Sequence, residues 1–274
     1  MTGPNMTWED AVRGLIEQPD QKDLVEACYF DQPVSRAAAR YHASDEWRGV
    51  RAEIGSVPGR ALDLGAGNGI ASYALAKDGW AVTAVEPDPS DLVGGGAIRN
   101  LAAAENLPIT VVESFGESLP LDAASFDLVV ARQVLHHALS LADLCAEIAR
   151  LLRPGGRLIA LRDHVINGPR QLAAFHARHP LHQLYGGEHA YTLAEYRAAL
   201  KAAGLIIDRE IRSLDSPINL APMTPESLAA RIPVAGKAAA ALLAGGRFWR
   251  LAPLLSRIDR RPGRLVSYMC RKPD

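Results

Sequence analysis

The stretch ALDLGAGNG, residues 61–69, decides the fold that this sequence encodes. A strand-like apolar run leads into three glycines that alternate with other residues, Gly65, Gly67 and Gly69. A glycine-rich turn between a strand and a helix is the usual ligand-binding feature of doubly wound α/β folds. Asp63 adds a carboxylate at the end of this strand. The first question is which ligand suits a glycine turn with a negative charge beside it.

Strand-like and helix-like runs alternate around this turn, from residue 60 to residue 163. The strand-like runs are ALDL, AVTAVE, ITVVES, FDLVVAR and RLIALRD, and helices are predicted at 70–77, 98–104 and 141–152. Such alternation specifies right-handed βαβ units and a parallel sheet. Two further strand-like runs, LIIDREIRSL and RLVSYMCRK, lie near the end of the chain.

The patterns divide the chain into four regions. Residues 1–55 have helical patterns and form a predicted N-terminal helical lid, and residues 56–163 form the predicted cofactor-binding core. Residues 164–203 form a His-rich cap segment with a helix, and five of the eight histidines fall between positions 164 and 189. Residues 204–274 hold the last two strands. A helical insertion at 215–262 is too long for a plain hairpin loop and is interpreted as a cap.

Composition excludes several classes of partner. The chain has 274 residues and a formal net charge of −1, and it has no long Lys/Arg block that would favour nucleic acid or an anionic membrane surface. Its three cysteines are far apart and form no disulfide framework or metal knuckle. No signal peptide or membrane span is recognisable, which predicts a cytoplasmic protein.

The spacing of the turn selects among nucleotide ligands. Dinucleotide-binding turns read G-x-G-x-x-G, whereas this turn reads G-x-G-x-G. Asp63 would repel a pyrophosphate but attract an ammonium group. Glu86 ends the next strand, about 20 residues downstream, where an acidic residue binds ribose hydroxyls. A ligand that combines a ribose with a cationic amino acid is S-adenosylmethionine.

Four segments in order resemble the class I S-adenosylmethionine-dependent methyltransferases, in particular the small-molecule branch of the ubiquinone-biosynthesis type. These segments are ALDLGAGNG, VEPD, GESLPLDAASFDLVVARQVLHH and LLRPGGRLIA, and together they span about residues 60–162. The resemblance implies a Rossmann-like, seven-stranded, mostly parallel sheet with a final antiparallel strand. It also implies that the helical segment before the glycine turn closes over the cofactor.

The resemblance assigns the cofactor contacts residue by residue. It implies that the methionine moiety is lined by Asp63, Gly65, Ala66 and Gly67, that Glu86 and Pro87 hold the ribose and adenine, and that Gly116 and Glu117 flank the adenine. Arg132 is placed beside the reactive methyl group. Where relatives often have an Asp that accepts from the adenine amino group, this chain has Ser114-Phe115. Adenine is therefore expected to stack on Phe115 or to meet a backbone carbonyl.

Two histidines are candidates for the general base that a hydroxyl acceptor needs. His164 follows the fifth predicted strand, on the ligand side of the sheet, and His189 follows the pair Gly186-Gly187. Arg132 is the third predicted catalytic residue, since arginines there could also bind an anionic acceptor group.

The remaining histidines receive other interpretations. His136 and His137 are attributed to helix packing. No metal is predicted at His176, His179 and His182, because Pro180 interrupts their helix and no carboxylate or cysteine joins them at ligand spacing.

The sequence therefore predicts methyl transfer to a small-molecule acceptor, most readily at oxygen, by in-line displacement in a dry site. Nitrogen and carbon acceptors stay open. The alternatives are a protein that uses the same cofactor for cyclisation or decarboxylation, an NAD-dependent oxidoreductase, and a non-catalytic binding protein. A homodimer is also an open alternative.

Overall fold

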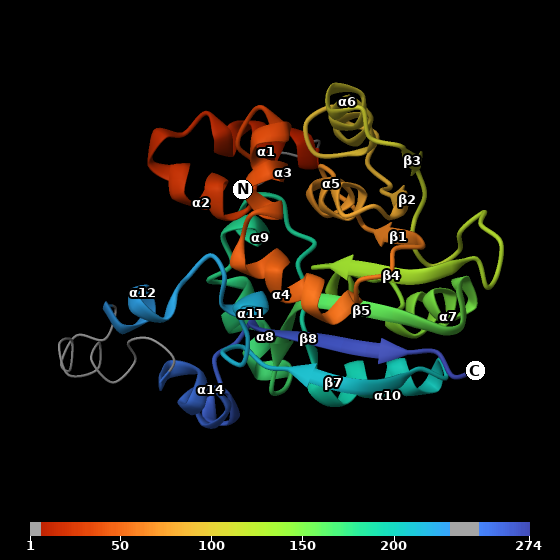
Figure 1. Ribbon diagram of the computed structural model, residues 1–274. Coiled ribbons are helices and arrows are strands. Elements are labelled where there is room, and N and C mark those ends of the chain that lie inside the picture. The colour runs from red at the N-terminus through yellow and green to blue at the C-terminus, as the bar shows by residue number, and fades with distance from the viewer. Residues whose placement is uncertain (1–6, 231–246) are drawn as a thin grey trace.

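The computed structural model describes residues 7–230 and 247–274, and its centre is one twisted sheet. The main path of the sheet has the order β3-β2-β1-β4-β5-β8-β7, and a short strand, β6, pairs with β5 (Figure 1). The strands are β1 (Arg60–Leu64), β2 (Ala81–Val85), β3 (Ile109–Val112), β4 (Phe126–Arg132), β5 (Leu152–Ile166), β6 (Tyr191–Thr192), β7 (Ile206–Ile211) and β8 (Arg264–Arg271). Strands β1 to β5 pair in parallel, and β8 runs antiparallel to both β5 and β7. The predicted fold class is confirmed, and within residues 7–230 and 247–274 the structure adds one strand, β6, to the seven predicted strands.

Helices cover both faces of this sheet. Those of the core region are α5 (Ile70–Lys77), α6 (Gly95–Glu105), α7 (Leu141–Leu151) and α10 (Leu193–Ala202). Before β1 lie α1 (Trp8–Ile16), α2 (Lys22–Ala27), α3 (Val34–His42) and α4 (Asp45–Ile54). The later segments contain α8 (Pro169–His176), α9 (Pro180–Leu184), α11 (Pro217–Leu220), α12 (Pro225–Ala230) and α14 (Arg247–Ile258).

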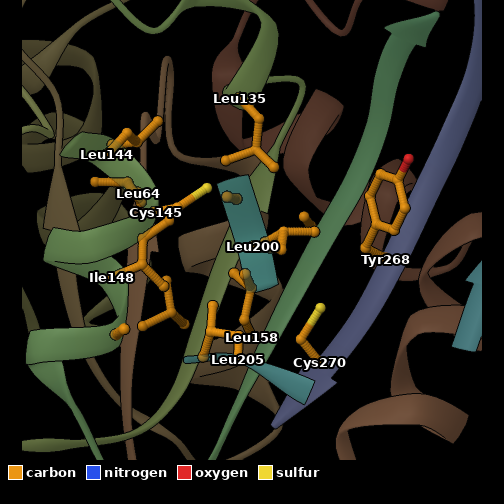
Figure 2. Packing of buried hydrophobic residues seen from close by; sticks show 14 of the residues in the cluster. Leu64, Leu135, Leu144, Cys145, Ile148, Leu158, Leu200, Leu205, Tyr268 and Cys270 are labelled. Carbon is orange, nitrogen blue, oxygen red and sulfur yellow. The ribbon is translucent and has the colours of Figure 1, made fainter. Parts of the chain in front are cut away.

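The hydrophobic core has one layer on each face. On one face, α7 and α10 pack against the sheet through residues such as Leu144, Ile148 and Leu200, all buried (Figure 2). On the other face, α3, α4 and α5 pack through a cluster that includes Tyr41 and Trp47. Because the N-terminal helices supply part of this second layer, they are fixed to the core and not merely tethered to it.

Strand β5 is longer than the sequence predicts. Its predicted end is near Asp163, but the strand continues to Ile166, and Asp163 and His164 pair with Val266 and Leu265 of β8. The antiparallel partner satisfies backbone groups beyond the end of the parallel pairing, so the strand persists. His164 therefore lies inside a central strand, and its prediction as a residue of the loop that follows β5 is wrong.

Part of the long insertion between β7 and β8 packs in a buried cluster separate from the main core. Phe248 and Ala252 of α14 pack with Leu214 and Leu220 in a separate buried cluster. Figure 1 shows α12 and α14 at the left of the view, beyond the ends of β7 and β8 that the insertion connects. Positions 231–246 of this predicted cap lie outside the described residues. Across the described ranges, no helix has both the length and the hydrophobicity needed to cross a membrane.

Candidate active site

A cavity of about 1310 Å³ opens at the carboxyl ends of β1, β2 and β4. The strand order reverses here, because β2 and β4 lie on opposite sides of β1. Open α/β sheets bind their ligands at such switch points. The walls come from the turns after β1 to β4, from the N-terminal helices and from residues 181–187. Every residue that the sequence assigns to the cofactor lies in these walls: Asp63, Gly65, Ala66, Gly67, Glu86, Pro87, Phe115, Gly116, Glu117 and Arg132.

The glycine turn requires its glycines for two different reasons. Gly65 has φ +64°, and a Cβ there would lie 2.6 Å from Cγ2 of Val134, so a side chain is excluded by both conformation and space. Gly67 has φ +55°, and a Cβ there would meet no atom within 4 Å. The backbone at Gly67 is therefore open to close approach by a ligand.

Asp63 brings a desolvated carboxylate to this turn. Asp63 is 1% exposed, and its Oδ2 accepts a hydrogen bond of 2.6 Å from the Ser72 hydroxyl. Burial raises the pKa of Asp63 to about 7, although the Ser72 hydrogen bond acts in the opposite direction. A buried carboxylate with one hydroxyl partner gains from a cationic ligand that supplies the missing charge.

Glu86 is held across the same turn from the end of β2. Its two carboxylate oxygens accept backbone hydrogen bonds from Gly67, at 2.8 Å, and from Asp88, at 3.1 Å. Burial raises the pKa of Glu86, while these two backbone donors lower it. The carboxylate is thus oriented beside the backbone of the glycine turn, as a ligand for ribose hydroxyls must be.

The loop after β3 includes the predicted adenine contacts Phe115, Gly116 and Glu117. Phe115 is 65% exposed, which is unusual for a large aromatic ring and leaves its face available. A Cβ at Gly116 would come within 2.8 Å of Leu144, so the chain passes close to the core there. Glu117 accepts a hydrogen bond of 2.9 Å from the backbone of Leu139, which joins the loops after β3 and β4.

Arg132 reaches the cavity but is already paired. Its guanidinium donates to both carboxylate oxygens of Glu46 on α4, at 2.6 and 3.2 Å. Burial opposes the charge of Arg132, but the Glu46 carboxylate outweighs burial and raises the pKa of the guanidinium. Glu46 is 1% exposed, so this fork is a buried ion pair between the N-terminal helices and the end of β4. Sequence reasoning missed Glu46, which lies 86 residues earlier in the chain.

Neither predicted general base lies in the cavity wall. His164 is 8% exposed, and its Nδ1 lies 2.9 Å from the carbonyl of Gly263. Burial, with a contribution from the charge of His136, lowers the pKa of His164 to about 3. His189 packs edge-on against Tyr191, with ring centroids 4.5 Å apart. The structure thus brings neither ring to the place where an acceptor would bind.

Two histidines attributed to packing line the cavity instead, His136 and His137. Nδ1 of the buried His136 lies 2.9 Å from Asp163, and its Nε2 lies 3.4 Å from Glu188. Burial lowers the pKa of His136, but these two carboxylates outweigh burial and raise it to about 9. The side chain of His137 is 45% exposed, and burial together with the charge of His136 lowers its pKa to about 4. The sequence alone did not identify Glu188 as a site residue, although it directly follows Gly186-Gly187.

The N-terminal helices and residues 181–187 meet over the cavity. Trp8 of α1 packs against Phe30 and Tyr185, with ring centroids 5.9 and 5.5 Å apart. Asn68 of the glycine turn donates to the backbone carbonyl of Tyr29, at 2.7 Å, and so ties the turn to this cover. No described residue of the insertion at 215–262 lines the cavity, which does not support its interpretation as a cap over the ligand.

Comparison with known proteins agrees with this geometry. Residues 62–160 match a family model described as a methyltransferase domain. The ubiquinone biosynthesis O-methyltransferase of Methylocella silvestris is 37% identical over 101 residues, which cover 37% of this chain and 38% of that enzyme. The chain thus spans less than half the length of that curated relative.

Two solved structures share the fold over most of the chain. A geranyl diphosphate methyltransferase in complex with S-adenosylmethionine has a TM-score of 0.59 at 14% identity, covering 95% of this chain and 94% of the other. The [4+2]-cyclase SpnF has a TM-score of 0.56 at 20% identity, covering 88% and 82%. These two likenesses concern the fold alone. Residues 62–160 therefore match a methyltransferase domain in sequence.

Proposed function

We propose that this protein transfers a methyl group from S-adenosylmethionine to a hydroxyl group of a small-molecule acceptor. The observation that carries the proposal is the pairing of two buried carboxylates, Asp63 and Glu86, with the glycine turn in one cavity of about 1310 Å³. Pockets for one small ligand typically measure ~300–1,000 Å³, so this cavity has room for an acceptor beside the cofactor.

The cofactor contacts follow from the chemistry of each wall. Asp63 pairs with the ammonium group of the methionine moiety, beside the backbone of Gly65, Ala66 and Gly67. Glu86 accepts from the ribose hydroxyls, and Phe115 stacks on the adenine. The adenine also lies against Pro87, Gly116 and Glu117. When bound, the cofactor supplies an electrophilic methyl group, and the chain has to align the acceptor and exclude water.

The acceptor side of the cavity offers His137 as the proton acceptor. It lines the cavity, and its lowered pKa keeps the ring neutral near pH 7, so that a nitrogen can accept a proton. His164 and His189, the sequence candidates, are not retained for this role because neither reaches the cavity. Arg132 acts as a positioning residue, since Glu46 already occupies its guanidinium.

The whole proposal predicts a specific pair of products. Incubation with S-adenosylmethionine and a panel of hydroxylated aromatic and aliphatic acceptors should yield S-adenosylhomocysteine and an acceptor heavier by one methylene, measured by mass spectrometry. His137→Asn should reduce kcat for hydroxyl acceptors, whereas the matched His189→Asn should not. An isomerised or decarboxylated product without S-adenosylhomocysteine would favour the non-methylating alternative. A nicotinamide-dependent absorbance change would favour an oxidoreductase.

The regional assignments are part of the same proposal. Residues 1–55 act as the lid, 56–163 as the cofactor-binding core and 164–203 as the cap segment that completes the acceptor side, and residues 204–274 complete the sheet. A cytoplasmic location, the absence of nucleic-acid and membrane partners and a homodimer stay predictions from the sequence. Fractionation of cells and light scattering on the purified chain would test them.

A further inference from the structure

Three residues with metal-ligating side chains meet beside the cavity. His136 lies in the 3-10 turn after β4 (Leu135–His137), His164 lies in β5, and Glu188 lies in the loop before β6. One ligand-type atom from each lies within 4.8 Å of the other two. All three residues are buried, with exposures of 1%, 8% and 8%. The chain therefore gathers two imidazoles and a carboxylate from segments that are distant in sequence.

The spacing within this triad suits a small divalent ion. Nε2 of His136 lies 3.4 Å from Oε2 of Glu188. Zinc bonds to nitrogen and oxygen of ~2.0–2.2 Å in a tetrahedron place two ligand atoms about 3.3 Å apart. His136 and Glu188 already have this separation, and His164 lies within 4.8 Å of both, so a modest inward movement of one ring completes the set.

Hydrogen bonds at the far side of each ring leave the near nitrogens available. Nδ1 of His136 lies 2.9 Å from a carboxylate oxygen of Asp163, and Nδ1 of His164 lies 2.9 Å from the carbonyl of Gly263. Both oxygens can only accept, so each Nδ1 carries a proton. Nε2 of His164 then keeps a lone pair, and Nε2 of His136, which faces Glu188, has to release its proton when a metal ion binds. Carboxylate and carbonyl partners of this kind orient the histidine ligands of metal sites.

Glu188 has a buried oxygen atom that a cation would satisfy. Its Oε2 is buried and accepts no hydrogen bond of ordinary geometry from any described residue, although Nε2 of His136 lies 3.4 Å away. A buried carboxylate oxygen without a partner is costly, and a metal ion is one of the few groups that satisfies it. A protonated His136 between Asp163 and Glu188 is the competing explanation, but it assigns no role to the lone pair of His164.

We propose that His136, His164 and Glu188 bind a divalent transition-metal ion of the zinc class. Two histidines and a glutamate fill three positions of a tetrahedron and leave one open, as in catalytic zinc sites. The sequence predicted no metal, because no carboxylate stands at ligand spacing from its histidines, and the fold brings Glu188 to them from the following loop. Since His136 lines the cavity, the site borders the region where an acceptor would bind.

The role of the ion rests on the proposed function. A bound metal ion lowers the pKa of a coordinated hydroxyl group and so forms the oxygen nucleophile without a strong base. The metal site itself can be tested without any methyl transfer.

The experiment titrates the full-length chain, stripped of metal with a chelator, with Zn²⁺ alone and with Co²⁺ alone. We expect one tight equivalent by calorimetry, a tetrahedral Co²⁺ absorption spectrum and a higher Tm with Zn²⁺. Glu188→Gln and His164→Asn should abolish the tight equivalent. Asp163→Asn, which changes only a residue behind His136, should weaken it by ~10–100-fold. The matched His189→Asn should bind as tightly as the unaltered chain.

Two outcomes would overturn the proposal. One is a stripped chain that takes up no Zn²⁺ although it binds S-adenosylmethionine, which shows that it is folded. The other is Zn²⁺ binding that survives Glu188→Gln but is lost in a double variant, His176→Asn with His182→Asn. The rings of His176 and His182 stack with their centroids 3.9 Å apart, and this result would assign the metal to that pair. Because cofactor binding and metal binding are measured separately, loss of methyl transfer alone decides neither.

Discussion

Asp63→Asn separates the electrostatic basis of cofactor recognition from the stability of the fold. The substitution keeps the size of the side chain and an oxygen that can accept from Ser72, but removes the charge. A hydrogen bond to a charged group contributes about 1.5–3 kcal/mol. Its loss should weaken S-adenosylmethionine binding by about 10–150-fold. The product S-adenosylhomocysteine has the same ammonium group, so its binding should weaken by the same factor.

The effect on stability should have the opposite sign. Burial raises the pKa of Asp63 from 3.8 to about 7, which corresponds to about 4 kcal/mol against the ionised form in the folded protein. The Asp63 contribution to the free energy of unfolding is therefore fully present below pH 3.8 and is lost as the pH rises through about 7. Above that pH, Asp63→Asn should be at least as stable as the original chain, and its free energy of unfolding should be higher by up to about 4 kcal/mol.

Calorimetry on either side of neutral pH, with denaturant unfolding, measures both effects. In the original chain, affinity for S-adenosylmethionine should increase as Asp63 ionises, and in Asp63→Asn this dependence should be absent. Methylthioadenosine, which lacks the amino acid end, is the control ligand and should bind both chains alike. The reasoning is refuted if Asp63→Asn binds S-adenosylmethionine with unchanged affinity, or if its affinity for methylthioadenosine falls by the same factor.

Three further substitutions test the other walls of the site. Phe115→Ala should weaken S-adenosylmethionine and methylthioadenosine together, since stacking contributes ~1–3 kcal/mol per base; unchanged calorimetric affinity would favour a backbone contact to adenine. Glu46→Gln should lower the free energy of unfolding by about 3–5 kcal/mol, because Arg132 is left buried and unpaired. Burial acts to raise the pKa of Glu46, but the charge of Arg132 outweighs burial, and the net effect is a lowered pKa. The contribution of Glu46 to the free energy of unfolding is therefore present above pH 4.5 and is lost on acidification. Denaturant unfolding across pH should show this loss in the original chain and not in the variant. Trp8→Ala should speed cofactor dissociation by about 2–10-fold in stopped-flow measurements, since one aromatic contact contributes ~0.5–1.5 kcal/mol; an unchanged rate would argue against α1 as a lid.

The segments that the sequence predicted well are those whose signal is local. The helix at 70–77 has the predicted bounds, because apolar periodicity acts over a few neighbouring positions. The cofactor side of the cavity was predictable for the same reason. The glycine turn, Asp63 and Glu86 lie at the ends of adjacent parallel strands, so strand order alone brings them together.

The acceptor side depended on contacts between distant segments. Glu46 and Arg132 are 86 residues apart, and Asp163 and His136 are 27 apart. Periodicity reports which face of an element is apolar, but not which distant polar group will be buried against it. His164 shows the consequence, because the antiparallel pairing with β8 extended β5 and buried that ring. Sequence thus determined the fold and the glycine turn at the proposed cofactor site. Only tertiary packing decided that His136, His164 and Glu188 meet, because their proximity depends on strand pairing and loop return and not on spacing along the chain.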